Sequence, residues 1–466
     1  MQTEATPSKL SIGQRLDRLP LTGWHRRILA LIGVGMFLDA FDINLGAGVL
    51  GAMMHDGWST LELNAAFVSA TFVGMTVGAA MSGWVGDRYG RRLSYQINLA
   101  IFGGASLLAA FAPNITVLIG LRFVMGIGLG AEIVVGYSTL TEFIPARARG
   151  YWICVLSVIT NASLFVASAV SLWVIPRFGW RPMFLIVGVL AILVWRARKA
   201  MPESPRWLEA RGRLAEAEQV IDAAEALVPP GAMLPAGPDE SAGTQQPDSW
   251  SVLLTRPVIG RLLIGMLLNI TVGFSLYGFI NWLPSFMLKS GQSLVSSLFF
   301  TMVVSAGAPF GPFIAMFIAD RLGRKPSIVL ASLCAAALGV GFAFTKDPTL
   351  FAVLGFLLVA SLYVMGLGFS VYTPELFATS YRMRAAAVCG ATGRLATAGV
   401  QYIVIAAFAT GGVPAVVGLL VCLLVFQAIV VGVFGVETKG RSLEAIAPPV
   451  DGERSGPLGS PVSARR

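Results

Sequence analysis

Apolar stretches of about 20 residues recur along the whole chain, and each is long enough to cross the hydrocarbon core of a bilayer as an α-helix. Glycine pairs such as Gly74 and Gly78 predict close approach of helix backbones, and Pro309 and Pro312 predict a kink or break in the eighth stretch. The pattern predicts an all-α membrane protein with twelve transmembrane helices near residues 28–52, 61–84, 93–112, 115–140, 151–174, 182–200, 258–283, 293–318, 326–345, 349–372, 386–410 and 413–435.

The basic residues lie mostly on one side of these spans. If the N-terminus is cytoplasmic, the outer side holds only Arg177, Arg181, Lys289 and Lys346, and the cytoplasmic segments hold nearly all other Lys and Arg residues. The positive-inside rule therefore predicts that both termini are cytoplasmic. The first apolar stretch is too long for the core of a cleavable signal peptide, so we expect it to act as an uncleaved insertion signal.

One polar interruption, residues 201–257, is much longer than the others. Its first part, from Arg206 to Leu227, has helical periodicity, and residues 229–248 are rich in Pro, Gly and Ser, which predicts a flexible linker. The interruption divides the spans into two groups of six. The expected units are a cytoplasmic N-terminal segment 1–27, a six-helix bundle 28–200, a cytoplasmic linker 201–257, a second six-helix bundle 258–435 and a cytoplasmic tail 436–466.

Composition supports the membrane class and argues against several others. The chain is 55% hydrophobic and only 13% charged, which is too little charge for a soluble protein of this size. The net charge of +9 is spread over short segments between apolar runs, which does not favour nucleic-acid binding. The four cysteines lie in apolar runs, the two histidines lie near helix ends, and no catalytic or phosphate-binding motif is present, so we expect neither an enzyme nor a cofactor or metal site.

The chain contains an internal repeat. The loop after the second span reads Asp87-Arg-Tyr-Gly-Arg91, and the loop after the eighth reads Asp320-Arg-Leu-Gly-Arg324. Nearly the same separation relates Glu142 to Glu375, Arg149 to Arg382 and Glu203 to Glu437. These matches predict two copies of a six-helix unit in the same orientation.

These loops, the Arg122-Phe-x3-Gly-x-Gly-x-Gly stretch and the Glu437-Thr-Lys-Gly-Arg segment resemble the major facilitator superfamily, in particular its sugar-porter and metabolite:proton symporter branches. The second loop departs from the pattern, because Met316 stands where the first copy has Gly83. The resemblance implies that acidic and basic residues at the cytoplasmic helix ends form a latch between the two halves. In this resemblance Glu142 pairs with Arg149, and Glu375 pairs with Arg382. The residues that match the latch are Asp87, Arg88, Arg91, Glu142, Arg149, Asp320, Arg321, Arg324, Glu375 and Arg382.

Ionisable residues within the spans are rare, and each is a candidate for function because charge in the bilayer core is costly. Asp39 and Asp42 share one face of the first helix. Asp42 lies roughly 21 Å from the cytoplasmic end of that helix, and Arg122 lies roughly 10 Å from the outer end of the fourth. In a core about 30 Å thick these depths nearly coincide, so we expect the two to pair.

In the resembled symporters, a first-helix aspartate and a fourth-helix arginine form a proton switch, and Asp42 and Arg122 match them. We therefore expect proton coupling to involve Asp39, Asp42, Arg122 and Glu132. A permanent buried salt bridge between Asp42 and Arg122 is the alternative. For Glu132 the alternative is a role in helix packing.

Polar and aromatic residues in the spans predict the substrate class. Arg394 has no acidic partner in its own helix, and its planar guanidinium suits a carboxylate. Because amides and aromatic rings lie nearby, we expect the substrate to be a small organic acid, with aromatic carboxylates among the candidates. For Trp282 the alternative is a place in the interfacial aromatic belt or in the protein core. The expected substrate-binding residues are Asn44, Asn161, Tyr277, Asn281, Trp282, Arg394 and Gln401.

Other functions stay open at this point. The Gln-Gln pair that sugar porters carry in the seventh helix is absent, but the Glu437-Thr-Lys-Gly-Arg segment resembles sugar porters, so a sugar or polyol is the second choice. Ala40 after Asp39 departs from the aromatic-acid branch, which has glycine there. An exporter of amphipathic compounds and a nutrient sensor are further alternatives. The expected partners are a small-molecule substrate, protons and the lipid bilayer of the inner membrane, and a monomer suffices because both halves are present.

Overall fold

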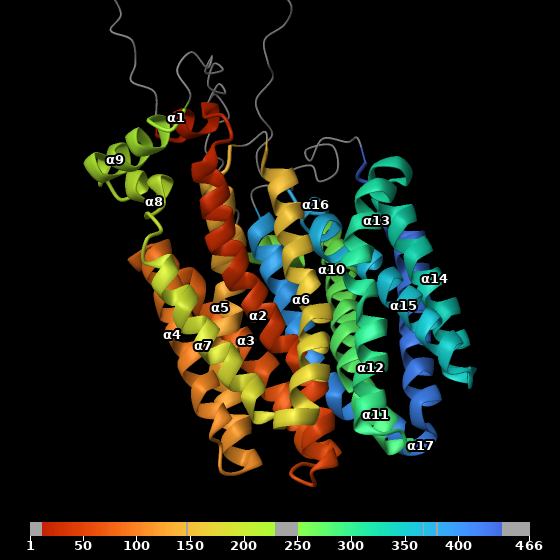
Figure 1. The fold of residues 1–466 in the computed structure, drawn as a ribbon. Helices are drawn as coiled ribbons and strands as arrows, with labels where there is room; N and C mark the ends of the chain where they lie inside the picture. The colour runs from red at the N-terminus through yellow and green to blue at the C-terminus, as the bar shows by residue number, and fades with distance from the viewer. Residues whose placement is uncertain (1–11, 146–147, 229–249, 367, 379–380, 440–466) are drawn as a thin grey trace, which may run out of the picture.

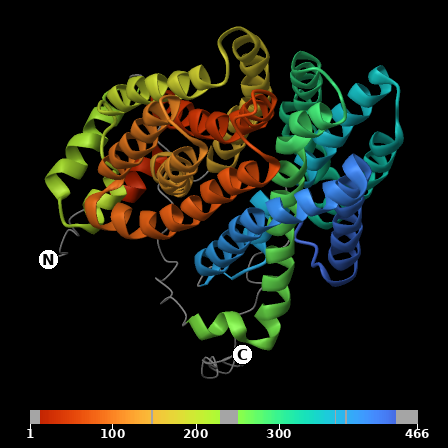
Figure 2. The same ribbon diagram turned by 90° about the horizontal axis from the view of Figure 1, so that it is seen from below.

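The computed structural model describes residues 12–145, 148–228, 250–366, 368–378 and 381–439, and every regular element in this part is helical. Two groups of long helices stand side by side (Figures 1 and 2). The first group, coloured red to yellow-green in Figure 1, comes from the N-terminal half, and the second, green to blue, from the C-terminal half. The predicted linker stretch 229–248 and most of the tail 436–466 lie outside the described residues.

The N-terminal bundle is built on close helix contacts. An added Cβ at Gly78 of α3 would overlap the carbonyl oxygen of Ile127 in α5, and an added Cβ at Gly130 of α5 would overlap that of Met75 in α3. Gly74 lies equally close to Phe123, so the predicted close approach is confirmed. The helices of this bundle are α2 (Gly23–His55), α3 (Leu61–Tyr89), α4 (Arg91–Ala110), α5 (Ile115–Phe143), α6 (Arg149–Phe178) and α7 (Arg181–Arg198).

The C-terminal bundle is more often interrupted. The seventh predicted helix is α10 (Arg256–Gly273), followed by a π-helix η3 (Phe274–Phe279), a 3-10 turn η4 (Ile280–Trp282) and α11 (Leu283–Lys289). The sequence predicted one unbroken helix here. Pro284 accounts for the η4 turn, because it has no N–H to donate to the carbonyl of Ile280. The interruption falls on Tyr277, Asn281 and Trp282.

The other helices of this bundle also show breaks. The predicted break in the eighth span is present between α12 (Leu294–Ser305) and α13 (Gly307–Leu322), because Pro309 cannot donate to the carbonyl of Ser305. The tenth predicted helix, near residues 349–372, is divided into the α-helix α15 (Pro348–Met365) and the π-helix η5 (Gly368–Tyr372). The remaining elements are α14 (Arg324–Phe344), α16 (Thr373–Glu375) and α17 (Arg382–Phe434).

Ten helical spans in the described residues are long and apolar enough to cross a membrane. The last, α17, has non-helical backbone at Gly411 and Gly412, where Gly412 takes a φ of 63° that favours glycine. This kink divides α17 into two membrane-length helices. The 18-residue α7 is not among the ten, and it carries Arg181, Arg196 and Arg198.

A small helical cap covers one end of the N-terminal bundle. It comprises α1 (Ile12–Arg18), α8 (Pro205–Ala210) and α9 (Leu214–Glu225), whereas the 3-10 turn η2 (Trp250–Leu254) that follows in the chain packs on the C-terminal bundle through Leu253. Leu16 of α1 packs on Leu208 and Ile221. Arg15 adds an ion pair to Glu225, with 2.6 Å between Nη2 and Oε2. The helical periodicity of the linker is thus confirmed, and its contact with the N-terminal segment is a feature that the sequence did not predict.

Candidate functional site

Asp42 of α2 and Arg122 of α5 form an ion pair in the interior of the N-terminal bundle. Arg122 Nη1 lies 2.6 Å from Asp42 Oδ2, and both side chains are almost fully buried. Arg122 also donates from Nε to Thr71 Oγ1 at 3.2 Å and lies over the ring of Phe67, 4.7 Å from its centre. The pairing expected from their depths is therefore present. Asp42 Oδ1 has no hydrogen-bond partner among the described residues, so the carboxylate is held on one side only.

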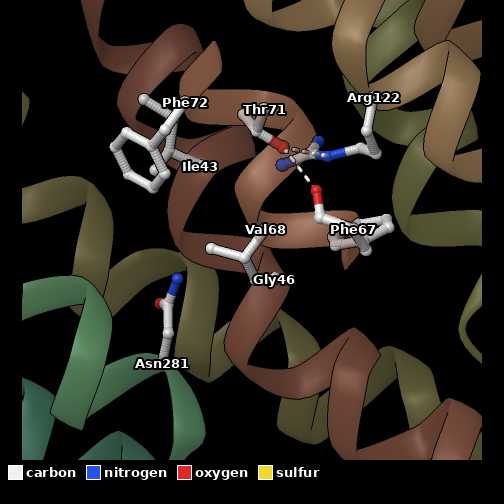
Figure 3. A pocket seen from close by; sticks show the side chains of 8 residues that line it. All are labelled: Ile43, Gly46, Phe67, Val68, Thr71, Phe72, Arg122 and Asn281. Carbon is white, nitrogen blue, oxygen red and sulfur yellow. Dashed lines mark hydrogen bonds between the residues drawn. The ribbon is translucent and has the colours of Figure 1, made fainter. Parts of the chain in front are cut away.

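A pocket lies directly beside Arg122, and Figure 3 shows its walls. Its volume is about 10 Å³, which is room for about one water molecule. Asn281 from the C-terminal bundle points into it from the opposite side (Figure 3). The pocket therefore joins the buried ion pair of one half to an amide of the other. Its lining residues are Ile43, Gly46, Phe67, Val68, Thr71, Phe72, Arg122 and Asn281.

A second buried charged cluster lies nearer the end of the bundle that carries the cap. Arg198 Nη1 pairs with Glu132 Oε1, and Arg198 also donates to the carbonyls of Leu31 at 2.9 Å and Ile32 at 3.1 Å. Asp39 is buried close enough to interact electrostatically with both Glu132 and Arg198. Neither Asp39 oxygen has a hydrogen-bond partner among the described residues.

Arg198 is the functional candidate that the sequence missed. Because Arg198 is the last residue of α7, the sequence places it among the basic residues at the cytoplasmic helix ends, which set topology. In the structure it is completely buried and lies over the ring of Tyr95, 4.4 Å from its centre. The available signal was Glu132, a carboxyl in an apolar helix that needs a cation as partner.

In the C-terminal bundle, the side chains of Trp282 and Gln401 are joined by a hydrogen bond. Trp282 Nε1 donates to Gln401 Oε1 at 2.7 Å, and Gln401 Nε2 donates to the carbonyl of Thr397 at 2.8 Å. Both side chains are fully buried, so Trp282 lies in the protein core, which was part of the alternative to a substrate-binding role, and not in the interfacial belt. Trp282 also stacks on Phe286, with 5.8 Å between ring centres.

Tyr277 and Arg394 lie close enough to interact electrostatically. The ring of Tyr277 lies 4.7 Å from that of Phe72 in the other bundle. Arg394 is partly buried and forms no hydrogen bond or ion pair with the part of the chain that the structure describes. It lies about 18 Å along α17 from its first residue, near the middle of a bilayer. Its guanidinium therefore has no anionic partner among the described residues.

The remaining candidates lie apart from the pocket. Asn44 Nδ2 donates to Ser163 Oγ at 3.1 Å within the N-terminal bundle. Asn161, on the same helix as Ser163, is partly buried. Of the seven residues predicted to bind substrate, only Asn281 lines the pocket, and Asn44, Asn161, Tyr277, Trp282, Arg394 and Gln401 do not. Across the described residues, no three His, Cys, Asp or Glu side chains come together as a metal site.

The loop charges of the N-terminal half form one cluster. Arg91 pairs with Glu142, with 2.9 Å between Nη2 and Oε1. The backbone N–H groups of Arg91 and Arg92 donate to the carboxylate of Glu203, at 2.8 Å and 3.2 Å. The Glu203 carboxylate thus faces the first turn of α4, where a negative charge is favoured.

The C-terminal half repeats this arrangement. Arg324 Nε lies 3.8 Å from Glu375 Oε2, and the N–H groups of Arg324 and Lys325 donate to Glu437 at 3.0 Å and 3.2 Å. Burial acts to raise the pKa of Glu437, but its backbone N–H donors outweigh this and hold the pKa below its ordinary value. The internal repeat seen in the sequence is therefore present in the contacts.

The expected pairing of Glu142 with Arg149 is not what the structure shows. Glu142 pairs with Arg91, and Arg149 lies 3.4 Å from Asp17 of α1 and donates to the carbonyl of Ile144. Arg382 donates in the same way to the carbonyl of Phe377. The physical reason is that both arginines begin a helix, where the preceding loop carbonyl is the nearest acceptor. The contacts described for this latch lie within each half.

The other predicted latch residues have simpler surroundings. Arg88 lies over the rings of Trp84 and Tyr89 at 5.7 Å from each centre, and its side chain is exposed. The carbonyl of Arg321 accepts from Lys439 Nζ at 2.8 Å. The side chains of Asp87 and Asp320 lie outside the described part of the structure.

Comparison with known proteins assigns the family. Residues 31–448 match the family model described as "Sugar (and other) transporter". The inner membrane metabolite transport protein YdjE of Escherichia coli is 36% identical, over 94% of this chain and 98% of that protein. The niacin transporter NiaP of Acinetobacter baylyi is 32% identical, over 94% of this chain and 100% of that protein.

The fold is shared with a solved transporter. The D-xylose-proton symporter superposes with a TM-score of 0.70 at 20% identity, covering 90% of this chain and 100% of that one. At this identity the likeness concerns the fold alone. The family match and these relatives show that the chain belongs to the sugar (and other) transporter family, as a multi-pass inner-membrane transporter and not an enzyme.

Proposed function

We propose that this protein is a secondary active transporter that couples the movement of a small organic acid to protons by alternating access between its two bundles. The observation that carries the proposal is the buried Asp42–Arg122 pair beside a pocket that Asn281 completes from the other half. In this proposal, α7 and both parts of α17 span the bilayer, which makes twelve spans with both termini in the cytoplasm.

The proton step follows from the geometry of this pair. Asp42 holds Arg122 through one carboxylate oxygen, and both side chains are removed from solvent. When a proton from the outer side binds the Asp42 carboxylate, the charge pair is broken and the Arg122 guanidinium becomes available to an anionic substrate. Release of substrate and proton on the other side restores the pair. The two states of the pair thereby bias the two states of the transporter.

The second cluster supplies a further proton site. Asp39 and Glu132 are two buried carboxyls with the single cation Arg198 between them. If both carboxyls were ionised, one negative charge would stay uncompensated in the interior, which is costly. We therefore propose that Asp39 carries a proton in this state and exchanges it during transport, whereas Arg198 holds Glu132 ionised.

Two observations support an organic acid as the substrate. Arg394 lies at mid-bilayer depth without a carboxylate partner among the described residues, and its planar guanidinium can bind both oxygens of a substrate carboxylate. One relative is a niacin transporter, and niacin is an aromatic carboxylic acid. Tyr277, beside Arg394, supplies an aromatic surface for such a ring.

The test is uptake into proteoliposomes that contain the full-length protein, with and without an inward proton gradient. The panel contains niacin, 4-hydroxybenzoate, benzoate and xylose, and wild type is compared with Asp42→Asn and with the exposed control Asp56→Asn. We expect the gradient to stimulate uptake of one carboxylate, and Asp42→Asn to lose the stimulation but keep exchange of that substrate. Asp56→Asn is expected to behave as wild type.

Other results would contradict this function. Uptake of xylose alone would favour a sugar symporter. Carboxylate flux that is independent of the gradient and unchanged in Asp42→Asn would make the Asp42–Arg122 pair a static salt bridge. Binding without any flux would favour a sensor, and outward transport alone would favour an exporter.

A further inference from the structure

A groove lies on the flank of the C-terminal bundle, between the first turns of α10 and the last turns of α17, away from the pocket beside Arg122. Its volume is about 530 Å³, which is within the range of small-molecule sites. The lining is apolar except for one guanidinium, that of Arg261. The residues that line it are Gly260, Arg261, Leu263, Ile264, Leu267, Phe426, Val430, Phe434 and Val436.

The groove opens sideways, into the region that the bilayer fills. Leu263, Phe426 and Phe434, which form its rim, are each more than half exposed. Because the chain spans a membrane, acyl chains and not water must cover these side chains. A lipid acyl chain in this groove therefore contacts the protein along most of the acyl chain's length.

Arg261 gives the groove a charged end. It lies about 7.5 Å along α10 from its first residue, and Leu267 lies about 9 Å deeper. Arg261 donates from Nη1 to the carbonyl of Leu376 at 3.4 Å, a long hydrogen bond, and no carboxylate pairs with it in the described part of the chain. A guanidinium near the membrane interface above an apolar groove matches the layout of a phospholipid, with its phosphate outermost and its acyl chain inward.

We propose that this groove is a binding site for an anionic phospholipid of the surrounding bilayer, with the phosphate on Arg261 and an acyl chain between α10 and α17. Charge complementarity selects the headgroup, because a bidentate guanidinium–phosphate contact requires a strong anionic acceptor. The site is independent of the transported substrate and of proton coupling.

The position of the groove connects it to the latch of the C-terminal half. Val436, in its wall, precedes Glu437, which accepts from the N–H groups of Arg324 and Lys325. Leu376, the acceptor of Arg261, follows Glu375, which lies beside Arg324. A bound lipid would thus contact the segments on both sides of this cluster.

The test is native mass spectrometry of the purified full-length protein, titrated with phosphatidylglycerol or phosphatidylcholine that have the same acyl chains. We expect wild type to bind phosphatidylglycerol about fivefold more tightly, the difference that one interfacial arginine supplies. Arg261→Gln should abolish this preference, and Arg261→Lys should keep most of it. The exposed arginine variant Arg177→Gln is the matched control and should bind as wild type.

The groove itself is tested by filling it. A Cβ at Gly260 would meet no atom within 4 Å, so the Gly260→Phe side chain can enter the groove without a backbone clash. We expect it to weaken binding of both lipids. Gly418→Phe is the control, because a Cβ there also meets no atom within 4 Å and this exposed glycine lies outside the groove.

Each of four results would overturn the proposal. The first is equal affinity of wild type for the two lipids, and the second is a headgroup preference that survives Arg261→Gln. The third is lipid binding unchanged by Gly260→Phe. The fourth is a loss of lipid binding in the controls Arg177→Gln and Gly418→Phe that equals the loss in the groove variants. Because no transport is measured, failure here leaves the proposed transport function untouched, and failure of that function leaves this site untouched.

Discussion

Arg198, at the end of α7, forms a completely buried ion pair with Glu132 near the middle of α5. The same guanidinium donates to the carbonyls of Leu31 and Ile32 in α2, so one side chain joins three helices of the N-terminal bundle. A buried charge is tolerated only when it is paired and hydrogen-bonded, and Arg198 meets both conditions. The stability of this bundle should therefore depend on this one arginine.

Arg198→Gln should destabilise the protein by about 3–5 kcal/mol, because it leaves the Glu132 carboxylate buried without a cation. The measurement is the thermal unfolding temperature of the purified protein in detergent. The double variant Arg198→Gln with Glu132→Gln should recover much of the loss, since it removes the unpaired charge. A single variant as stable as wild type would show that Glu132 carries a proton in the native state.

Gly35 is expected to accept no side chain. A Cβ at this position would overlap the guanidinium of Arg198, which cannot move without losing its contacts to α2. Gly35→Ala should therefore cost roughly 1–3 kcal/mol of stability. This cost is measured as a lower unfolding temperature. Gly104→Ala, where a Cβ meets no atom within 4 Å, should be neutral or slightly stabilising. Equal behaviour of the two variants would mean that the packing around Arg198 is loose.

Gln401→Leu should cost about 1–3 kcal/mol, because it leaves the buried indole N–H of Trp282 without an acceptor. Unfolding of the detergent-purified variants measures this cost. Adding Trp282→Phe should restore part of the stability by removing the unsatisfied donor. If Gln401→Leu instead abolishes transport at unchanged stability, Gln401 contacts the substrate in another state of the cycle.

The contribution of Glu437 should depend on pH. Its backbone N–H donors lower its pKa in the folded protein below the ordinary value of about 4.3. The ionised carboxylate therefore stabilises the fold fully above that ordinary value, and this stabilisation is lost as the pH falls through the lower folded pKa. Wild type should exceed Glu437→Gln in unfolding temperature at pH 7, and the gap should close on acidification. A gap that is constant with pH would exclude an electrostatic origin.

Much of the architecture was accessible from the sequence because the bilayer constrains it strongly. Hydrocarbon requires long apolar helices, and helix length converts residue number into depth. That conversion was sufficient to predict the contact of Asp42 with Arg122. The repeat likewise predicted that Arg91 and Arg324 occupy equivalent surroundings, which the contacts to Glu203 and Glu437 show.

The side-chain partners at helix ends were less accessible. Glu142 pairs with Arg91 and not with the expected Arg149, because Arg149 turns to the loop carbonyl of Ile144 and to Asp17 of α1. Asp17, for example, lies within reach of both Arg149 and Arg206. The choice of partner depends on helix rotation, which spacing along the chain does not specify.

The sequence by itself determined the membrane class, most of the helical spans, the duplicated half and the pairing of Asp42 with Arg122, since each follows from hydrophobic length or repetition. Only the tertiary structure decided that Arg198 lies in the interior and that Trp282 is bonded to Gln401. An arginine at a helix end looks the same in sequence whether it faces the interface or the core. Which of these it faces is decided by how α2, α4 and α5 pack around it.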